Sequence, residues 1–201
     1  MKIYLILFLC CVVNATPILC QTFDFNVACI SAYNDIIALK LESGIKKINI
    51  EKKINSNNQI PILLENYVDF LTVYTSGSLS EYELVKGKME QRVSELKNSQ
   101  KESAYTLYCQ AELHIQSAVL HIKFGEYLAC IFDIKKALKK LEKNQQQFPD
   151  FMPNNKSLGM LYAILGSIPQ EYHGALSFLG LKREVSKGMA LLKKASYNNM
   201  H

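Results

Sequence analysis

The chain has 201 residues, of which 49% are apolar and 20% charged, and it carries a net charge of +5. The length fits one domain or a short array of helical repeats, and the apolar content excludes a wholly disordered chain. The lysines are interspersed with glutamates instead of forming one basic stripe, so we expect no nucleic-acid partner. With only 9 glycines and 5 prolines, the sequence favours long helices over a many-stranded sheet.

The first twenty residues are typical of a secretory signal peptide. A lysine precedes an apolar run at 3–13, which is too short for a membrane span, and small and polar residues follow. Cleavage follows either Ala15 or Cys20. A lipoprotein reading would make Cys20 the acylated residue, although Leu19 stands where such signals place a small residue. We expect an exported protein of the periplasm or cell envelope, or a secreted one, in which 21–201 form one helical domain.

Beyond the signal, apolar residues recur every three or four positions, which is the spacing of amphipathic helices. The expected helices cover 26–39, 45–54, 61–74, 80–96, 102–122, 126–147, 156–168, 169–180 and 183–196. The breaks include "KLESG" at 40–44, and Ser80 with Glu83 forms a plausible capping pair. The segments 156–168 and 169–180 are apolar all round, so we expect both to be buried. No stretch alternates with period two for long enough to form a sheet, and the sequence predicts an all-α fold.

Two of the expected helical pairs match each other at one common offset. Aligning Cys130 with Gly44 also places Ser117 on Ser31, Ala118 on Ala32, Tyr127 on Leu41, Ile131 on Ile45 and Ile134 on Ile48. Small residues meet small ones and apolar residues meet apolar ones. Small side chains on both helices of a pair let antiparallel helices approach closely, so we expect two helical hairpins of the same design.

The stretch "IKFGEYLACIFDIKKAL" resembles the middle of a tetratricopeptide repeat. The matching positions are Gly125, Glu126 and Tyr127 at the turn, and Cys130, Ile134 and Ala137 in the second helix. His114 and His121 depart from the pattern, because large apolar or aromatic residues are usual there. The matching turns are about 86 residues apart, so the helical pair between them must be a degenerate unit. The resemblance implies antiparallel helical hairpins stacked as a short solenoid.

The segment "LGSIPQEYHGALSFLGLKREVSKGMALLKKA" is similar to part of the exported tetratricopeptide-like proteins of Bacteroidota-type bacteria. In those proteins, a break that contains glycine precedes a helix that begins with a glycine followed by an apolar residue. The matching residues in this sequence are Gly180 and the pair Gly188-Met189. A comparable pattern occurs in a eukaryotic tetratricopeptide family of outer-mitochondrial and inclusion-body-clearance proteins. Those relatives are generally longer, and the tail "SYNNMH" lacks the polar capping helix of a solenoid end. We therefore expect this chain to be the N-terminal part of a longer protein.

Candidate catalytic and metal-binding residues are few. His114 and His121 are spaced to share one helical face, with Cys109 and Glu112 nearby, as a metal site or a cysteine nucleophile would require. No metal or nucleophile motif surrounds them. We therefore expect both histidines to be packing residues and expect no catalytic residue, metal or cofactor. The carboxylates of Glu65, Asp69 and Asp133 are expected on solvated faces or in ion pairs.

If cleavage follows Cys20, three cysteines remain after the signal, at Cys29, Cys109 and Cys130. They are an odd number at unrelated spacings, and all lie within helical segments. We expect small buried side chains, although export would permit one disulfide bond.

Tyrosine is the more distinctive residue, since it is a common anchor of protein interfaces. The candidates for partner binding are Tyr67, Tyr74, Tyr105 and Tyr108.

The favoured function is a non-enzymatic exported scaffold or adaptor that binds a protein or peptide. The alternative is a carrier of an apolar small molecule or lipid, lined by 161–168 and 175–181, and the third reading is a hydrolase or metalloprotein using the cysteine–histidine group. The basic segment 135–143 either makes a peripheral membrane contact or packs on its neighbours. The oligomeric state is left open.

Overall fold

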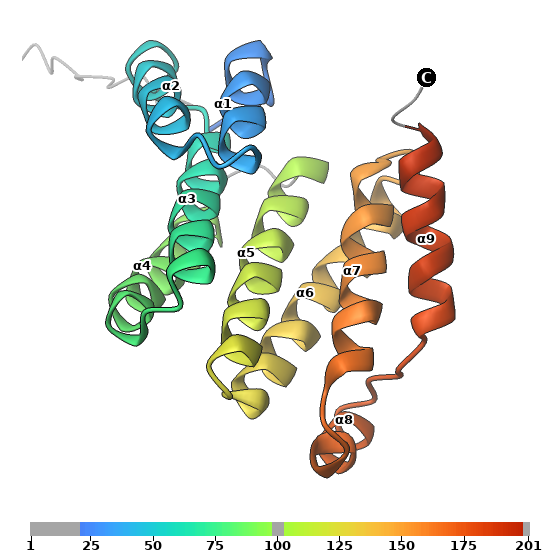
Figure 1. The fold of residues 1–201 in the computed structure, drawn as a ribbon. Coiled ribbons are helices and arrows are strands. Elements are labelled where there is room, and N and C mark those ends of the chain that lie inside the picture. Colours follow the sequence, from blue (N-terminus) through green and yellow to red (C-terminus); the bar gives the residue numbers. More distant parts are fainter. Residues whose placement is uncertain (1–20, 98–102, 199–201) are drawn as a thin grey trace, which may run out of the picture.

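The computed structural model describes residues 21–97 and 103–198 (Figure 1). The helices are α1 (Val27–Ile37), α2 (Leu41–Ile54), α3 (Ile60–Ser76), α4 (Leu79–Lys97), α5 (Ala104–Lys123), α6 (Tyr127–Gln147), α7 (Pro153–Ser167), the 3₁₀ turn η1 (Gln170–Tyr172), α8 (His173–Phe178) and α9 (Val185–Asn198). Within these two ranges no strand forms, and a single isolated bridge joins Thr22 to Asn58. The all-α prediction is confirmed. The predicted signal at 1–20 and the last residues of the tail, 199–201, lie outside the described residues.

The helices pack mainly with their neighbours along the chain. The pairs α1–α2, α3–α4 and α5–α6 are each in contact, and α3 also packs on α1 and α5. Farther along, α7 contacts α5 and α6 and pairs closely with α9, while α8 sits at one end (Figure 1). No helix of 21–97 or 103–198 is both long and apolar enough to cross a bilayer.

The turn between α1 and α2 has the same hydrogen-bond pattern as the turn between α5 and α6. Leu39 and Gly125 occupy the left-handed region, with φ of 59° and 78°. The next residue in each turn donates its N–H back to the helix, Lys40 to Asp35 O at 2.8 Å and Glu126 to His121 O at 2.7 Å. The donor and the acceptor of each bond in the first turn are separated from those of the matching bond in the second turn by the predicted sequence offset. The predicted correspondence of the two turns therefore extends to their backbone geometry.

The predicted break at 40–44 is wrong, because α2 already begins at Leu41. Gly44 lies inside α2, where a Cβ would stand 2.5 Å from Cγ1 of Ile36. The glycine serves close packing of α1 on α2, and the chain reverses just before it. One predicted equivalence also differs in burial, since Ile131 is 1% exposed but Ile45 is 40% exposed.

Two predicted helix starts shift toward the N-terminus. α4 begins at Leu79, and the Ser78 hydroxyl, in place of Ser80, accepts the N–H of Glu81 at 3.3 Å. Gly77 ends α3 with φ of 66°, so the next side chain along is the first that can cap the new helix. α7 begins at Pro153, because proline is tolerated in a first helical turn.

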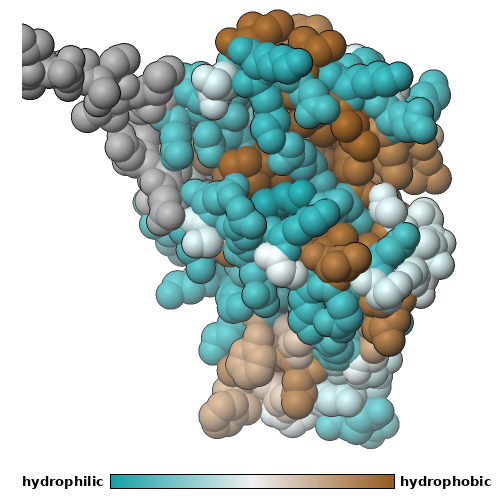
Figure 2. All heavy atoms as spheres, turned by 90° about the vertical axis from the view of Figure 1, so that its left-hand side faces the viewer, coloured by the Kyte–Doolittle hydropathy of each residue, from teal (hydrophilic) through white to brown (hydrophobic). Residues whose placement is uncertain are grey.

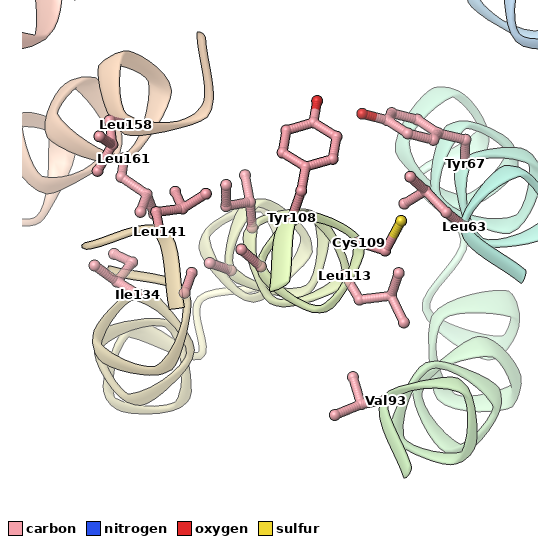
Figure 3. Close-up of a cluster of buried hydrophobic side chains, with 14 of the residues drawn as sticks. Leu63, Tyr67, Val93, Tyr108, Cys109, Leu113, Ile134, Leu141, Leu158 and Leu161 are labelled. Carbon is pink, nitrogen blue, oxygen red and sulfur yellow. The ribbon is translucent and has the colours of Figure 1, made fainter. Parts of the chain in front are cut away.

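The core is built around α5, which is buried along most of its length. Figure 3 shows side chains of α3, α4, α6 and α7 gathered around this helix. Ala137 and Leu141 of α6 are fully buried, so the apolar side of 135–143 is docked on its neighbours. The predicted burial of 169–180 is wrong for α8, since Leu176 is its one buried residue and Phe178 is 89% exposed.

The face formed by the first four helices is mostly hydrophilic, with separate hydrophobic patches (Figure 2). Large apolar side chains exposed on these helices include Val27, Ile50, Ile54 and Leu84. The lysines and glutamates of α2 and α4 lie among them, as their amphipathic sequences predict. Glu65 and Asp69 make the predicted ion pairs, with Lys52 at 2.6 Å and with Arg92 at 2.7 Å.

Candidate functional site

A cleft of about 340 Å³ lies where α1, α3, α5, α7 and the end of α9 approach one another. Its lining residues are Phe25, Tyr33, Ile60, Leu63, Tyr67, Tyr105, Tyr108, Met152, Pro153, Lys156 and Ala195. We call this the aromatic cleft. It contains three of the four predicted tyrosines, which come from two different helices.

Tyr74 is the predicted tyrosine that lies elsewhere. It is 46% exposed near the end of α3, and its ring packs on Phe70 with centroids 5.6 Å apart. Nζ of Lys123 lies 4.9 Å from the centre of the same ring. The reason is helical spacing, because seven residues carry the chain about two turns beyond Tyr67, past the end of the cleft.

The walls of the aromatic cleft are rings held against one another. Tyr33 meets Tyr67 edge to face with centroids 5.5 Å apart, and Phe25 stacks on Tyr105 at 6.1 Å. Tyr105 also meets Tyr108 edge to face at 6.5 Å. Such pairs fix ring positions, so the cleft presents preformed apolar walls.

A buried carboxylate lies beneath these rings. Glu112 of α5 is 2% exposed, and it accepts hydrogen bonds from the hydroxyls of Tyr67 and Ser157. Nζ of Lys156 lies 3.9 Å from Oε2 of the same carboxylate. A buried carboxylate is costly unless hydroxyls or cations satisfy it, and here three different groups surround it. The network joins α3, α5 and α7 at the base of the cleft.

The protonation of these groups follows from burial and from Glu112. Burial, and next the charge of Glu112, raise the pKa of the Tyr67 and Tyr108 hydroxyls above their ordinary value. Burial alone would lower the pKa of Lys156, but Glu112 and the neighbouring tyrosines outweigh it, and the pKa is raised. At neutral pH the cleft therefore presents neutral phenols and a charged ammonium.

Sequence reasoning missed Lys156, Tyr33 and Phe25. Lys156 had a usable signal, because it is the one charged residue at the head of the apolar segment 156–168. Tyr33 and Phe25 had none, since only the packing of α1 on α3 brings them to the cleft.

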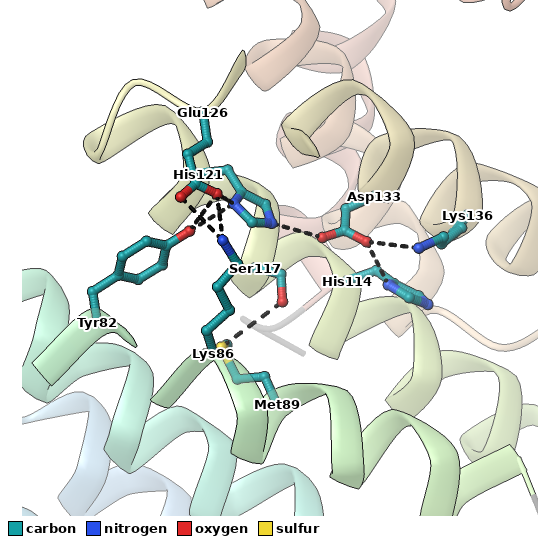
Figure 4. Close-up of polar contacts among 9 residues, drawn as sticks. All are labelled: Tyr82, Lys86, Met89, His114, Ser117, His121, Glu126, Asp133 and Lys136. Atoms are coloured by element: carbon teal, nitrogen blue, oxygen red, sulfur yellow. Dashed lines mark hydrogen bonds and ion pairs between the residues drawn. The ribbon is translucent and has the colours of Figure 1, made fainter. Parts of the chain in front are cut away.

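A second polar cluster lies between α4, α5 and α6 (Figure 4). In α6, Oδ1 of Asp133 lies 3.0 Å from Nδ1 of His114, and Oδ2 of Asp133 lies 3.2 Å from Nε2 of His121. Nδ1 of His121 also lies 2.8 Å from Oε2 of Glu126, to which Tyr82 donates at 2.9 Å. Both histidines are buried at the contact of α5 with α6, where packing residues were predicted. Asp133 makes a predicted ion pair, but it is only 9% exposed and does not lie on a solvated face.

Cys109 does not join this cluster. It is fully buried on the side of α5 that faces Leu63 and Tyr67 of α3 (Figure 3). Burial raises the pKa of its thiol, which opposes formation of the nucleophilic thiolate. Within the described ranges, no group of three or more His, Cys, Asp and Glu side chains could hold a metal ion. The convergence that the hydrolase and metalloprotein reading requires is therefore not observed.

Cys29, Cys109 and Cys130 are all buried free thiols, as small packing residues would be. The disulfide bond that export would permit does not form among them.

Comparison of the chain with family models, with curated proteins and with solved structures finds no match. The fold and the site define its class: an all-α protein with an aromatic cleft over a buried carboxylate.

Proposed function

We propose that the protein is a non-enzymatic scaffold or adaptor that binds a segment of a partner protein in the aromatic cleft. The observation that carries this proposal is the convergence of Tyr67, Tyr105 and Tyr108 on one preformed cleft. Tyrosine supplies a large, rigid contact area and a polar hydroxyl, which is why it anchors many interfaces.

A tetratricopeptide-like stacking of hairpins belongs to the same proposal. Its support is the repeated turn at Leu39 and Gly125, together with the helix contacts in chain order. In such an array, the first helices of successive hairpins face a shared groove. The helices that contribute most of the cleft, α1, α3, α5 and α7, hold these positions along the chain. Export to the periplasm or cell envelope is a further part of the proposal and rests on the sequence.

The test is capture of partners from cell-envelope extract by the purified protein and by matched variants. We expect a partner that is retained by the wild type and by Tyr74→Ala but lost with Tyr105→Ala. Tyr74 is a suitable control because it is a half-exposed tyrosine of the same helical layer outside the cleft. Thermal unfolding of each variant verifies that the comparison is made between folded proteins. Loss of the partner with both variants, or with neither, would contradict binding in the cleft.

A carrier of an apolar small molecule is the second candidate. The predicted lining segments 161–168 and 175–181 contribute no residue to the aromatic cleft, so the molecule would lie in this cleft instead, and the size of the cleft favours such a role. About 340 Å³ lies at the lower end of the range of small-molecule sites. The carrier reading predicts that organic extraction of the purified protein releases one apolar compound in stoichiometric amount. The scaffold reading predicts no such compound, so the same preparation separates the two candidates.

A further inference from the structure

The aromatic cleft contains hydrogen-bond donors that have no acceptor. Tyr33 and Tyr105 line the cleft, and the hydroxyl of neither forms a hydrogen bond with any residue of 21–97 or 103–198. Their rings pack against neighbouring aromatic side chains of the cleft wall. Both phenols can therefore donate a hydrogen bond to an acceptor from outside the chain.

Lys156 adds a positive charge to the same wall. Its Nζ lies 3.9 Å from Oε2 of Glu112, which is longer than the roughly 2.7–2.9 Å of a charge-assisted hydrogen bond. Both oxygens of that carboxylate already accept hydroxyl groups, from Tyr67 and Ser157. Besides its hydrogen bond with Tyr108, the ammonium keeps donor capacity for an acceptor in the cleft, because it has three N–H groups, and its side chain is 36% exposed.

The positions of the two charges decide which ligands the cleft accepts. Glu112 is 2% exposed and does not line the cleft, whereas Lys156 does. A bound anion would therefore stand closer to the ammonium than to the carboxylate, and attraction would outweigh repulsion. A bound cation would meet the ammonium first, and Nζ of Lys156 already lies 6.0 Å from the centre of the Tyr33 ring. The cleft disfavours a second cation.

We infer that the aromatic cleft selects an aromatic group that carries an anionic substituent. The ring of the ligand packs among the cleft tyrosines, while its anionic group accepts from Lys156 and from the hydroxyls of Tyr33 or Tyr105. This inference rests on the proposed function, in which a partner peptide places an acidic residue beside an aromatic one. A free aromatic acid offers the same chemistry, and the experiment includes both sources.

The chain has no tryptophan, so a ligand that carries an indole ring can be followed by its own fluorescence. Three capped peptides, Gly-Trp-Asp-Gly, Gly-Trp-Asn-Gly and Gly-Trp-Lys-Gly, are titrated with the purified full chain. Indole-3-propionate and its neutral amide form the small-molecule arm. We expect the acidic peptide to bind about tenfold more tightly than its neutral counterpart, and the basic peptide to bind most weakly.

The variant Lys156→Gln tests whether this lysine causes the preference for the acidic peptide. We expect it to abolish the tenfold preference while leaving the affinity for the neutral peptide nearly unchanged. Lys139→Gln, on the exposed side of α6, removes the same charge elsewhere and should retain the preference. If Lys156→Gln does not fold, the peptides are titrated with the wild type at increasing salt concentration. A preference for the acidic peptide that is caused by charge must then decrease, because salt screens the interaction.

Equal affinity for the acidic and neutral peptides overturns the inference, as does tighter binding of the basic peptide or no binding of any ligand. These outcomes leave the proposed function separately testable. A partner protein lost with Tyr105→Ala, found together with equal peptide affinities, would keep the scaffold and remove the selectivity. Binding of indole-3-propionate without any of the peptides would instead identify a small-molecule site and contradict the scaffold.

Discussion

Tyr67 of α3 donates a hydrogen bond to Glu112 of α5, a carboxylate that is 2% exposed. The bond links two helices that are far apart in the sequence and forms part of the base of the aromatic cleft. Because both partners are buried, breaking the bond leaves a polar group with one donor fewer and no water to replace it. The contact therefore contributes both to stability and to the shape of the cleft.

Tyr67→Phe removes this donor while keeping the ring. We expect the free energy of unfolding to fall by about 1–3 kcal/mol, the cost of an unsatisfied buried polar group. Urea unfolding followed by circular dichroism measures it. Tyr74→Phe removes a hydroxyl from a half-exposed ring and should change stability by less than about 0.5 kcal/mol. Equal effects of the two substitutions would show that the Glu112 contact contributes nothing.

The carboxylate of Asp133 should make the stability of the protein depend on pH. Burial alone would raise the pKa of this carboxyl, but hydrogen bonds from His114 and His121 outweigh it and hold the pKa well below its ordinary value of 3.8. The unfolded chain therefore takes up this proton first as the pH falls. The stabilisation is complete above about pH 5 and is lost progressively below it.

Asp133→Asn should cost about 1.5–3 kcal/mol at pH 6, as expected for hydrogen bonds to a charged group. The difference between wild type and variant should shrink as the pH falls from 5 toward 2. Chemical unfolding at a series of pH values tests this. A difference that stays constant over that range would mean that the ionised form of Asp133 is not what stabilises the fold.

Gly188 permits the close approach of α9 to α7. A Cβ at this position would stand 2.7 Å from Cβ of Tyr162 and 2.9 Å from the carbonyl oxygen of Gly159. Gly188→Ala should therefore destabilise the protein by about 1–3 kcal/mol through overpacking. Gly87 of α4 is the matched control, because a Cβ there has no neighbour within 4 Å. Gly87→Ala should raise the thermal midpoint by stabilising the helix by about 1 kcal/mol.

In the two equivalent turns, substitutions at Leu39 and at Gly125 should change the stability of the protein in opposite directions. Leu39 carries a side chain in the left-handed region, which costs about 1–2 kcal/mol, whereas Gly125 holds the same conformation without that strain. Leu39→Gly should stabilise by about 0.5 kcal/mol after the greater chain entropy of glycine is subtracted. Gly125→Ala should destabilise by about 1 kcal/mol, and nothing within 4 Å would obstruct its Cβ. Shifts of the same sign in thermal unfolding would contradict the equivalence of the turns.

The helices and one repeated turn could be predicted because they depend on local information. Apolar spacing locates each helix, and the glycine of "KFGEY" permits the left-handed residue that ends α5. The first turn was misplaced because Leu39 adopts that conformation without being glycine, while Gly44 is a packing glycine inside α2. The alignment with Cys130 placed Gly44 inside the second helix, in agreement with the structure, whereas the predicted break at 40–44 did not.

The candidate site was predictable only in part. Three of the four candidate tyrosines line the cleft, and their role in partner binding stays a prediction. Tyr74 lies outside the cleft because it is about two helical turns beyond Tyr67, and the sequence does not show where the cleft ends. The pairing of Asp133 with both histidines was missed, since it depends on the register of α6 against α5.

By itself the sequence determined the all-α class, the approximate extent of most helices and the matching of two hairpin turns, because these follow from periodicity and from backbone conformation within a few residues. Tertiary structure alone decided that Tyr33, Tyr67, Tyr105, Tyr108 and Lys156 enclose one cleft above Glu112. These groups come from four helices spread along most of the described chain. Their meeting depends on how the helices cross and on the register of each contact, and no local pattern in the sequence encodes either.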